Sequence, residues 1–374
     1  MLITLAAPAF AETWYIENGD ITVKAGETGN DVTQNNVTTK NDTDTIITNQ
    51  KTDTASSNTV TIDAENDKVE VKLDNVNIKA DSGSALTSKG DVTLALNGDN
   101  HLTGGISGTG NYGRNGIAST GSLTISGGEN DSLTAQGGSG ADGSYGGHGI
   151  YSNGSLTISG GTVNATGGDG SNVNGSGISS NGSVTISGGT VTANGGNGGN
   201  VSGDGIRSDG GVTISGGTVK AAGGDGSDGG SGISSSSGVT VSDGTVTANG
   251  GNGGNVSGDG IRSDGGVTIS GGTVKAAGGN GGKVGGYGIC SFDRVTISGN
   301  TVNAAGGNGG KVGGYGICSF DRVAISGGTV EAAGGSSSRN GGSGIYSNDI
   351  DLSGSLELTA KAGSPNGKAL SQKG

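Results

Sequence analysis

Two identical stretches of sequence carry many of the side chains that could recognise a ligand. The sequence GGNGGKVGGYGICSFDRV occupies residues 278–295 and recurs unchanged at 306–323, 28 residues later. Aromatic rings stack on sugar rings, and cationic side chains pair with uronate carboxylates. The alternative is that these residues only cover the glycines of a corner and recur because the segment was duplicated. The candidate carbohydrate-binding residues are Tyr287, Tyr315, Phe292, Phe320, Lys283, Lys311, Arg294 and Arg322.

Aspartates in the glycine-rich turns form a second candidate set. Ca²⁺ takes six to eight oxygen ligands, which carboxylates and the carbonyl groups of such turns can supply. Aspartate also favours turns for conformational reasons alone, so a structural role fits the same residues. The candidate calcium ligands are Asp204, Asp209, Asp259, Asp264, Asp225 and Asp228.

The two cysteines occupy equivalent positions in the two identical stretches. With one repeat between them, Cys290 and Cys318 are expected to have Cα atoms about 5 Å apart, within the range of a disulfide. Neighbours on parallel strands often have poor geometry for that bond, so two stacked free thiols are the alternative. Alternation along the strand predicts that Ile289 points inward and Cys290 outward.

We predict no catalytic residues. The two histidines, His101 and His148, are 47 residues apart and do not occupy matching repeat positions. A polysaccharide lyase would need clustered acidic ligands beside a basic residue, and no repeat carries such a group.

An internal repeat of about 28 residues explains these spacings. The motif Gly-Ile-x-Ser recurs with its isoleucine at positions 117, 150, 178, 206, 233, 261, 289, 317 and 345. Each unit contains three short runs with alternating apolar residues, as in GIRS, VTIS and TVKA, separated by glycine-containing corners. Period-two alternation is typical of strands with one buried face, and glycine supplies positive φ angles at sharp bends.

Three strands per unit and a constant period predict an all-β fold, a parallel β-helix of roughly 9–11 coils with about 28 residues per coil. The unit is too short for a four-stranded propeller blade, a β-sandwich would not repeat its sequence, and the nine-residue period of a calcium-binding β-roll is missing. We expect a signal-peptide remnant at 1–11, an N-terminal cap at 12–57, the β-helix at 58–363 and a linker at 364–374.

Residues Val71–Ile78 and Ala85–Gly105, followed by the Gly-Ile-x-Ser and VTISGG units, resemble a bacterial family. It comprises the clostridial-type secreted β-helix "carbohydrate-binding domain" proteins, one of which binds polygalacturonate. The likeness covers most of the chain from residue 58 onward. It implies a right-handed β-helix, calcium ions in the turns and affinity for acidic polysaccharide.

The net charge of the chain restricts the classes of partner that it could bind. A net charge of −13 argues against nucleic acid, and no segment approaches the roughly 20 apolar residues that span a bilayer. We expect a secreted or cell-surface module that binds polysaccharide with calcium assistance, within a longer chain. A passive structural stalk is the rival. An ice-binding surface is a further alternative function, suggested by a row of threonines: Thr124, Thr157, Thr185, Thr213, Thr240, Thr268 and Thr296.

Overall fold

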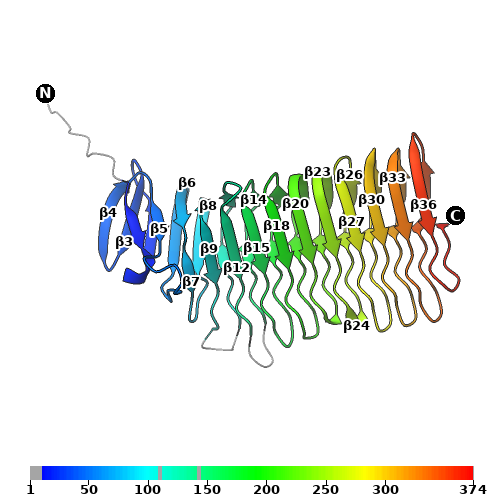
Figure 1. Cartoon of the computed structure of the whole chain (residues 1–374), viewed down its shortest axis with the longest axis horizontal. Coiled ribbons are helices and arrows are strands. Elements are labelled where there is room, and N and C mark those ends of the chain that lie inside the picture. The colour runs from blue at the N-terminus through cyan, green and yellow to red at the C-terminus, as the bar shows by residue number, and fades with distance from the viewer. Residues whose placement is uncertain (1–10, 108–111, 141–144, 374) are drawn as a thin grey trace.

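The apolar residues of each repeat form short strands that stack in register on the next repeat. The computed structural model describes residues 11–107, 112–140 and 145–373. Ile206 pairs with Ile178 on one side and with Ile233 on the other, in parallel. The chain is thus an all-β parallel solenoid of about 11 turns with roughly 28 residues per turn, as predicted, and it forms an elongated rod (Figure 1).

Each coil has three strands, and equivalent strands form three continuous faces. The first face is built from the Gly-Ile-x-Ser strands. They are β10 (Ile117–Ser119), β13 (Ile150–Ser152), β16 (Ile178–Ser180), β19 (Ile206–Ser208), β22 (Ile233–Ser235), β25 (Ile261–Ser263), β28 (Ile289–Ser291), β31 (Ile317–Ser319), β34 (Ile345–Ser347) and β37 (Leu370–Gln372).

The second face is built from the VTIS-type strands. They are β11 (Leu123–Ser126), β14 (Leu156–Ile158), β17 (Val184–Ile186), β26 (Gly266–Ile269), β29 (Val295–Ile297), β32 (Arg322–Ile325) and β35 (Asp349–Leu352). The third face contains β7 (Asn77–Lys79), β9 (Asp99–Thr103), β12 (Ser132–Gln136), β15 (Thr162–Thr166), β18 (Thr190–Asn194), β27 (Thr273–Ala277), β30 (Asn300–Ala305), β33 (Gly328–Ala333) and β36 (Leu356–Lys361).

Several strands continue around a corner and serve two faces. β20 (Val212–Ala222) and β23 (Gly238–Asn249) each join the second and third faces. β6 (Val60–Asp74) and β8 (Leu86–Asn97) join the first and second faces. The inward side chains of all three faces form one aliphatic core, in which Ile206, Ile214 and Val219 are fully buried.

The N-terminal cap lies at the N-terminal end of the rod and pairs with the edge of the first coil (Figure 1). It contains β1 (Thr13–Tyr15), a 3₁₀ turn η1 (Ile16–Asn18), β2 (Ile21–Ala25), β3 (Asn30–Gln34), β4 (Val37–Asp42) and β5 (Ile46–Thr48). β2 and β5 run parallel to β6, while β2, β3 and β4 form an antiparallel meander. The meander breaks the 28-residue repeat, which fits the irregular sequence of this region.

Glycine-rich segments leave the third face and return to the first face of the next coil, and we call them the arms. They hang from one side of the rod in Figure 1. Each is a narrow two-limbed excursion, in which Gly286 N donates to Gly279 O of the opposite limb at 2.9 Å. Gly279 N also donates to Gly258 O of the preceding arm, again at 2.9 Å. β21 (Gly226–Asp228) and β24 (Gly253–Val256) are short paired strands on two adjacent arms.

The arms explain why the chain needs so much glycine. A Cβ atom on Gly286 would lie 1.9 Å from Gly258 O, closer than any real contact allows. The prediction that glycine supplies positive φ is confirmed at the strand corners, as at Gly217 with φ of 75°. In the arms the reason is different, because there the glycines allow backbone to pack directly against backbone.

The structure tests the prediction for the C-terminal end of the chain but not the one for the N-terminal end. The linker expected at 364–374 is wrong for its described part, because β37 pairs with β34 and continues the first face. Nearly all of the signal-peptide remnant, residues 1–10, lies outside the described residues. Within the described part of the chain, no helix is long and apolar enough to cross a membrane.

Candidate functional site

Three rows of outward side chains run along the first face. Each coil contributes one residue to each row. The register of the strands and the backbone hydrogen bonds between coils define them. The arm-base row is His148, Ser176, Asp204, Ser231, Asp259, Tyr287, Tyr315 and Ser343. The strand row is Tyr151, Ser179, Arg207, Ser234, Arg262, Cys290, Cys318 and Tyr346. The corner row is Asp209, Ser236, Asp264, Phe292, Phe320 and Asn348.

The predicted stacking of the aromatic residues is confirmed. Tyr287 and Tyr315 lie 5.3 Å apart between ring centroids with planes 5° apart, and Phe292 and Phe320 lie 5.1 Å apart. Tyr346 extends the tyrosine stack, with its ring 4.7 Å from that of Tyr315, although it belongs to the neighbouring strand row. The two stacks flank the strand row and form an aromatic surface at the C-terminal part of the first face.

The aromatic stacks change the environment of the cysteines. Cys290 and Cys318 lie in the strand row of outward side chains, as the alternation predicts, but they are 2% and 0% exposed and therefore covered from solvent. Both lie outside the aliphatic core cluster, and burial together with the nearby Cys318 thiol raises the pKa of Tyr287 and of Tyr315. Of the two alternatives for this pair, the structure contains free thiols, and a hydrogen bond to Cys318 together with burial raises the pKa of the Cys290 thiol.

A hollow lies beside the tyrosine stack, between the arms and the first face. It has a volume of about 380 Å³, and its walls include Val256, Asp259, Arg262 and Tyr287. Arg262 Nη1 is 4.0 Å from Asp259 Oδ2, and its guanidinium lies 5.3 Å from the centre of the Phe292 ring. The hollow thus combines an aromatic edge, an apolar side chain, a carboxylate and a guanidinium. Such a combination is typical of small-ligand sites.

The arm-base carboxylates also hold adjacent coils together. Ser231 N donates to Asp204 Oδ1 at 2.6 Å, and Tyr287 N donates to Asp259 Oδ1 at 2.7 Å. Burial raises the pKa of Asp259 to about 6 and raises the pKa of Asp204 as well, despite these hydrogen bonds. His148 has the same role upstream, since its Nδ1 accepts the N–H of Ser176, and burial lowers its pKa to about 4.

A second ladder, on the other limb of the arms, accounts for Asp225. Its Oδ1 accepts the N–H of Asn252 at 2.6 Å, and Asn252 in turn accepts the N–H of Asn280 at 2.9 Å. Asparagine and aspartate therefore share one structural role along this ladder. Its members are Asp169, Asn197, Asp225, Asn252, Asn280 and Asn308.

The structure does not bring the six predicted calcium ligands together. Asp204 and Asp259 lie in the arm-base row, Asp209 and Asp264 in the corner row, and Asp225 and Asp228 on an arm. Among the described residues, no group of three or more His, Cys, Asp or Glu side chains converges on a point where an ion could sit. Calcium binding stays a prediction.

The cationic residues are dispersed rather than gathered on the aromatic surface. Lys283 and Lys311 stack through their backbones at the outer part of the arms, where Arg339 follows in the next coil. Arg322 begins the second-face strand β32 and pairs with Asp349 at 2.9 Å and Asp351 at 3.5 Å. Lys283 and Lys311 thus lie on the arms, apart from the first-face rows, and Arg322 lies at the start of the second face, two residues after Phe320; carbohydrate binding by these residues stays a prediction.

Arg262, which lines the hollow, is not among the predicted site residues, although the sequence repeat could have indicated it. It lies 28 residues before Cys290 and pairs with it across the strands, so the register alone places it beside the aromatic stacks. The register also confirms the threonine row, which extends upstream to Thr93 and ends at Ala324.

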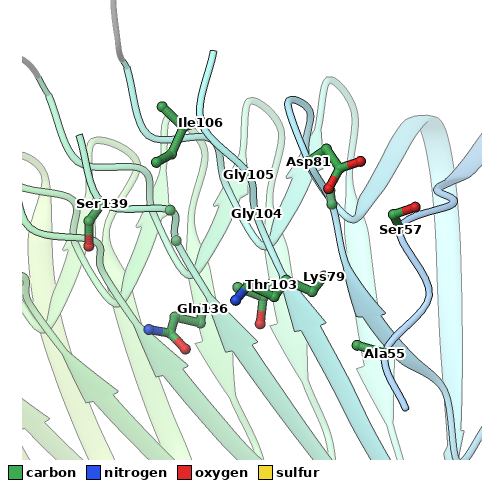
Figure 2. Close-up of a pocket in the computed structure, with 13 residues that line it drawn as sticks. Ala55, Ser57, Lys79, Asp81, Thr103, Gly104, Gly105, Ile106, Gln136 and Ser139 are labelled. Carbon is green, nitrogen blue, oxygen red and sulfur yellow. The ribbon is translucent and has the colours of Figure 1, made fainter. Parts of the chain in front are cut away.

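A larger hollow lies on the opposite side of the arms, near the N-terminal end. It has a volume of about 670 Å³. Figure 2 shows Lys79, Thr103 and Gln136 at the ends of neighbouring third-face strands, with Asp81 and Ser139 on the segments that follow them. Among the described residues that line it there is no aromatic ring, so it lacks a stacking platform for sugar.

Comparison with known families agrees with the architecture. The β-helix repeat family model matches residues 156–182, 184–206, 212–237, 267–289 and 323–345. These matches support the parallel β-helix fold, which the strand register shows independently. No curated protein and no solved structure matched the chain.

Proposed function

We propose that this protein is a polysaccharide-binding module whose ligand lies along the aromatic surface and the adjoining hollow. The observation that carries the proposal is the stack of Tyr287, Tyr315 and Tyr346 beside the Asp259–Arg262 hollow. Because the rings stack face to face at the coil spacing, they present a row of ring edges that runs along several coils, which suits a linear chain of sugars better than a single compact ligand. The resemblance to clostridial-type carbohydrate-binding β-helix proteins supports the same proposal, as it supports an extracellular or cell-surface location.

An acidic glycan held through calcium is the second candidate. The basic row of Lys283, Lys311 and Arg339 favours it, because stacked cations on a protein of net charge −13 would pair with a polyanion. Calcium would be required to bring such a glycan to the carboxylates of the first face, since direct contact would repel it. This candidate predicts that a chelator weakens binding.

Binding to a glycan array, with and without a chelator, tests the proposal. We expect binding to polysaccharide that persists in the chelator if the aromatic surface carries it. Binding that disappears in the chelator would favour the calcium-bridged acidic glycan. An absence of binding in both conditions would contradict the proposal and favour a passive stalk, and release of unsaturated uronides from pectin would instead indicate a lyase.

A further inference from the structure

The charged part of the first face repeats every two coils. The sequence Asp-Gly-Ile-Arg-Ser-Asp occurs at residues 204–209 and again at 259–264, and serines occupy all three rows in the coil between them. Arg207 and Arg262 both pair with Ser234, on its opposite sides. At about 4.8 Å per coil, the two charged groups are about 9.6 Å apart along the rod. The two Asp–Arg groups are therefore equivalent in sequence and register and are separated by a coil with small side chains, although Tyr287 and Phe292 follow only the second group.

We infer that the Asp259–Arg262 hollow and the Asp204–Arg207 group two coils before it are paired subsites for an extended neutral polysaccharide with a two-sugar repeat, lying parallel to the rod axis. This inference rests on the proposed function and specifies its ligand. In a linear β-1,4-linked glucan, successive rings alternate in orientation, so each ring presents the same face again two sugars later. The two-coil spacing is comparable to that repeat.

The atoms that face the hollow suit hydroxyl groups. Asp259 Oδ1 is occupied by the N–H of Tyr287, which leaves Oδ2, 4.0 Å from Arg262, to accept from sugar hydroxyls. Arg262 is partly exposed and held over Phe292, so its N–H groups can donate to sugar oxygens. Val256, which is 42% exposed, and Tyr287 provide apolar contacts for the C–H face of a ring.

The charge balance favours a neutral ligand over an acidic one. The two groups contribute two arginines against four aspartates, because Asp209 and Asp264 lie exposed beside the arginines in the corner row. Asp228 adds a further carboxylate to the wall of the hollow. A uronate would meet net negative charge here, whereas hydroxyl groups gain charge-assisted hydrogen bonds from both partners.

The use of aspartate, where asparagine would hold the coils together equally well, also points to a ligand. On the opposite limb of the arms, Asn252 and Asn280 accept the same inter-coil N–H bond without a charge. At Asp259 burial opposes ionisation, as its raised pKa shows. A buried charge kept at such a cost in stability is typical of a binding or reactive site rather than of a structural ladder.

Oligosaccharide length and the two arginines test the inference. The probes are cellobiose and cellotetraose, measured by calorimetry with wild type, Arg207→Gln, Arg262→Gln and the control Lys275→Gln, which removes one positive charge from the exposed third face. We expect cellotetraose, which spans both subsites, to bind about tenfold or more tightly than cellobiose. Each arginine variant should lose most of that advantage yet still bind cellobiose at the remaining subsite, and Lys275→Gln should match wild type.

Equal affinity for the two lengths, or arginine variants that match wild type, would overturn the inference. If only acidic polymer binds, and its binding depends on Tyr287, the inference fails while the proposed function survives. If no glycan of any kind binds, both fail.

Discussion

Replacement of Asp259 by asparagine should stabilise the protein at neutral pH. Asp259 is 6% exposed, and burial raises its pKa from 3.8 to about 6. The charged carboxylate is thus disfavoured in the folded state at pH 7. Since one pKa unit corresponds to about 1.4 kcal/mol, the removal of the charge should raise the free energy of unfolding by about 2–3 kcal/mol. The asparagine Oδ1 can still accept the N–H of Tyr287, as Asn252 does for Asn280 in the other ladder.

The pH dependence of this gain has a definite sign. Because the folded-state pKa is the higher one, the wild type gains stability from Asp259 as pH falls through 6, and the gain is complete below the unfolded-state value near 4. The advantage of Asp259→Asn should therefore be full at pH 7 and vanish near pH 4. The assay is denaturant unfolding of both proteins across that range, with the difference between them as the readout. This difference cancels the opposite effect of His148, whose lowered pKa removes stability as pH falls.

Asp225→Asn is the matched control, because Asp225 accepts an inter-coil N–H in the same way but is exposed. We expect it to change the free energy of unfolding by less than about 0.5 kcal/mol. A loss of stability in Asp259→Asn at pH 7, or a difference from wild type that is constant from pH 7 to pH 4, would refute the burial argument.

Two further predictions concern the arms and the thiols. Gly286→Ala should lower the free energy of unfolding by about 3 kcal/mol or more, because the added Cβ would clash with Gly258 O. Gly254→Ala is the control, since no atom lies closer than 3.8 Å to the added Cβ. Its free energy of unfolding, measured with denaturant, should stay within about 0.5 kcal/mol of wild type. Cys290 and Cys318, free and buried, should resist alkylation in the folded protein and react as two thiols after unfolding without reductant; a count of zero would show a disulfide.

The sequence repeat predicted which residues would be neighbours along the rod, because a solenoid places residue n beside residue n + 28. The pairing of Ile206 with Ile178 and the stacking of Phe292 on Phe320 follow from that relation alone. The same reasoning failed for positions within a coil. It could not show that Cys290 is covered or that Lys283 lies away from Phe292, because the path of the glycine arm is set by backbone packing that leaves no period in the side chains.

The arm also explains why the calcium prediction could not be settled from the sequence. Asp204 and Asp225 both lie in glycine-rich segments, yet they belong to separate ladders, on opposite limbs of successive arms. Side-chain type indicated oxygen ligands, while the inter-coil hydrogen bonds give these carboxylates another role.

The most direct test of the central claim compares two tyrosine pairs on the same polysaccharide. Tyr287 and Tyr315 stack on the proposed binding surface, and Tyr112 and Tyr145 form a tilted pair, also 5.3 Å between centroids but with planes 39° apart, on the N-terminal arms. We expect replacement of Tyr287 and Tyr315 by alanine to weaken binding about tenfold or more in affinity electrophoresis, while replacement of Tyr112 and Tyr145 leaves it unchanged. Equal binding by both variants, or loss only in the Tyr112 and Tyr145 variant, would contradict the account.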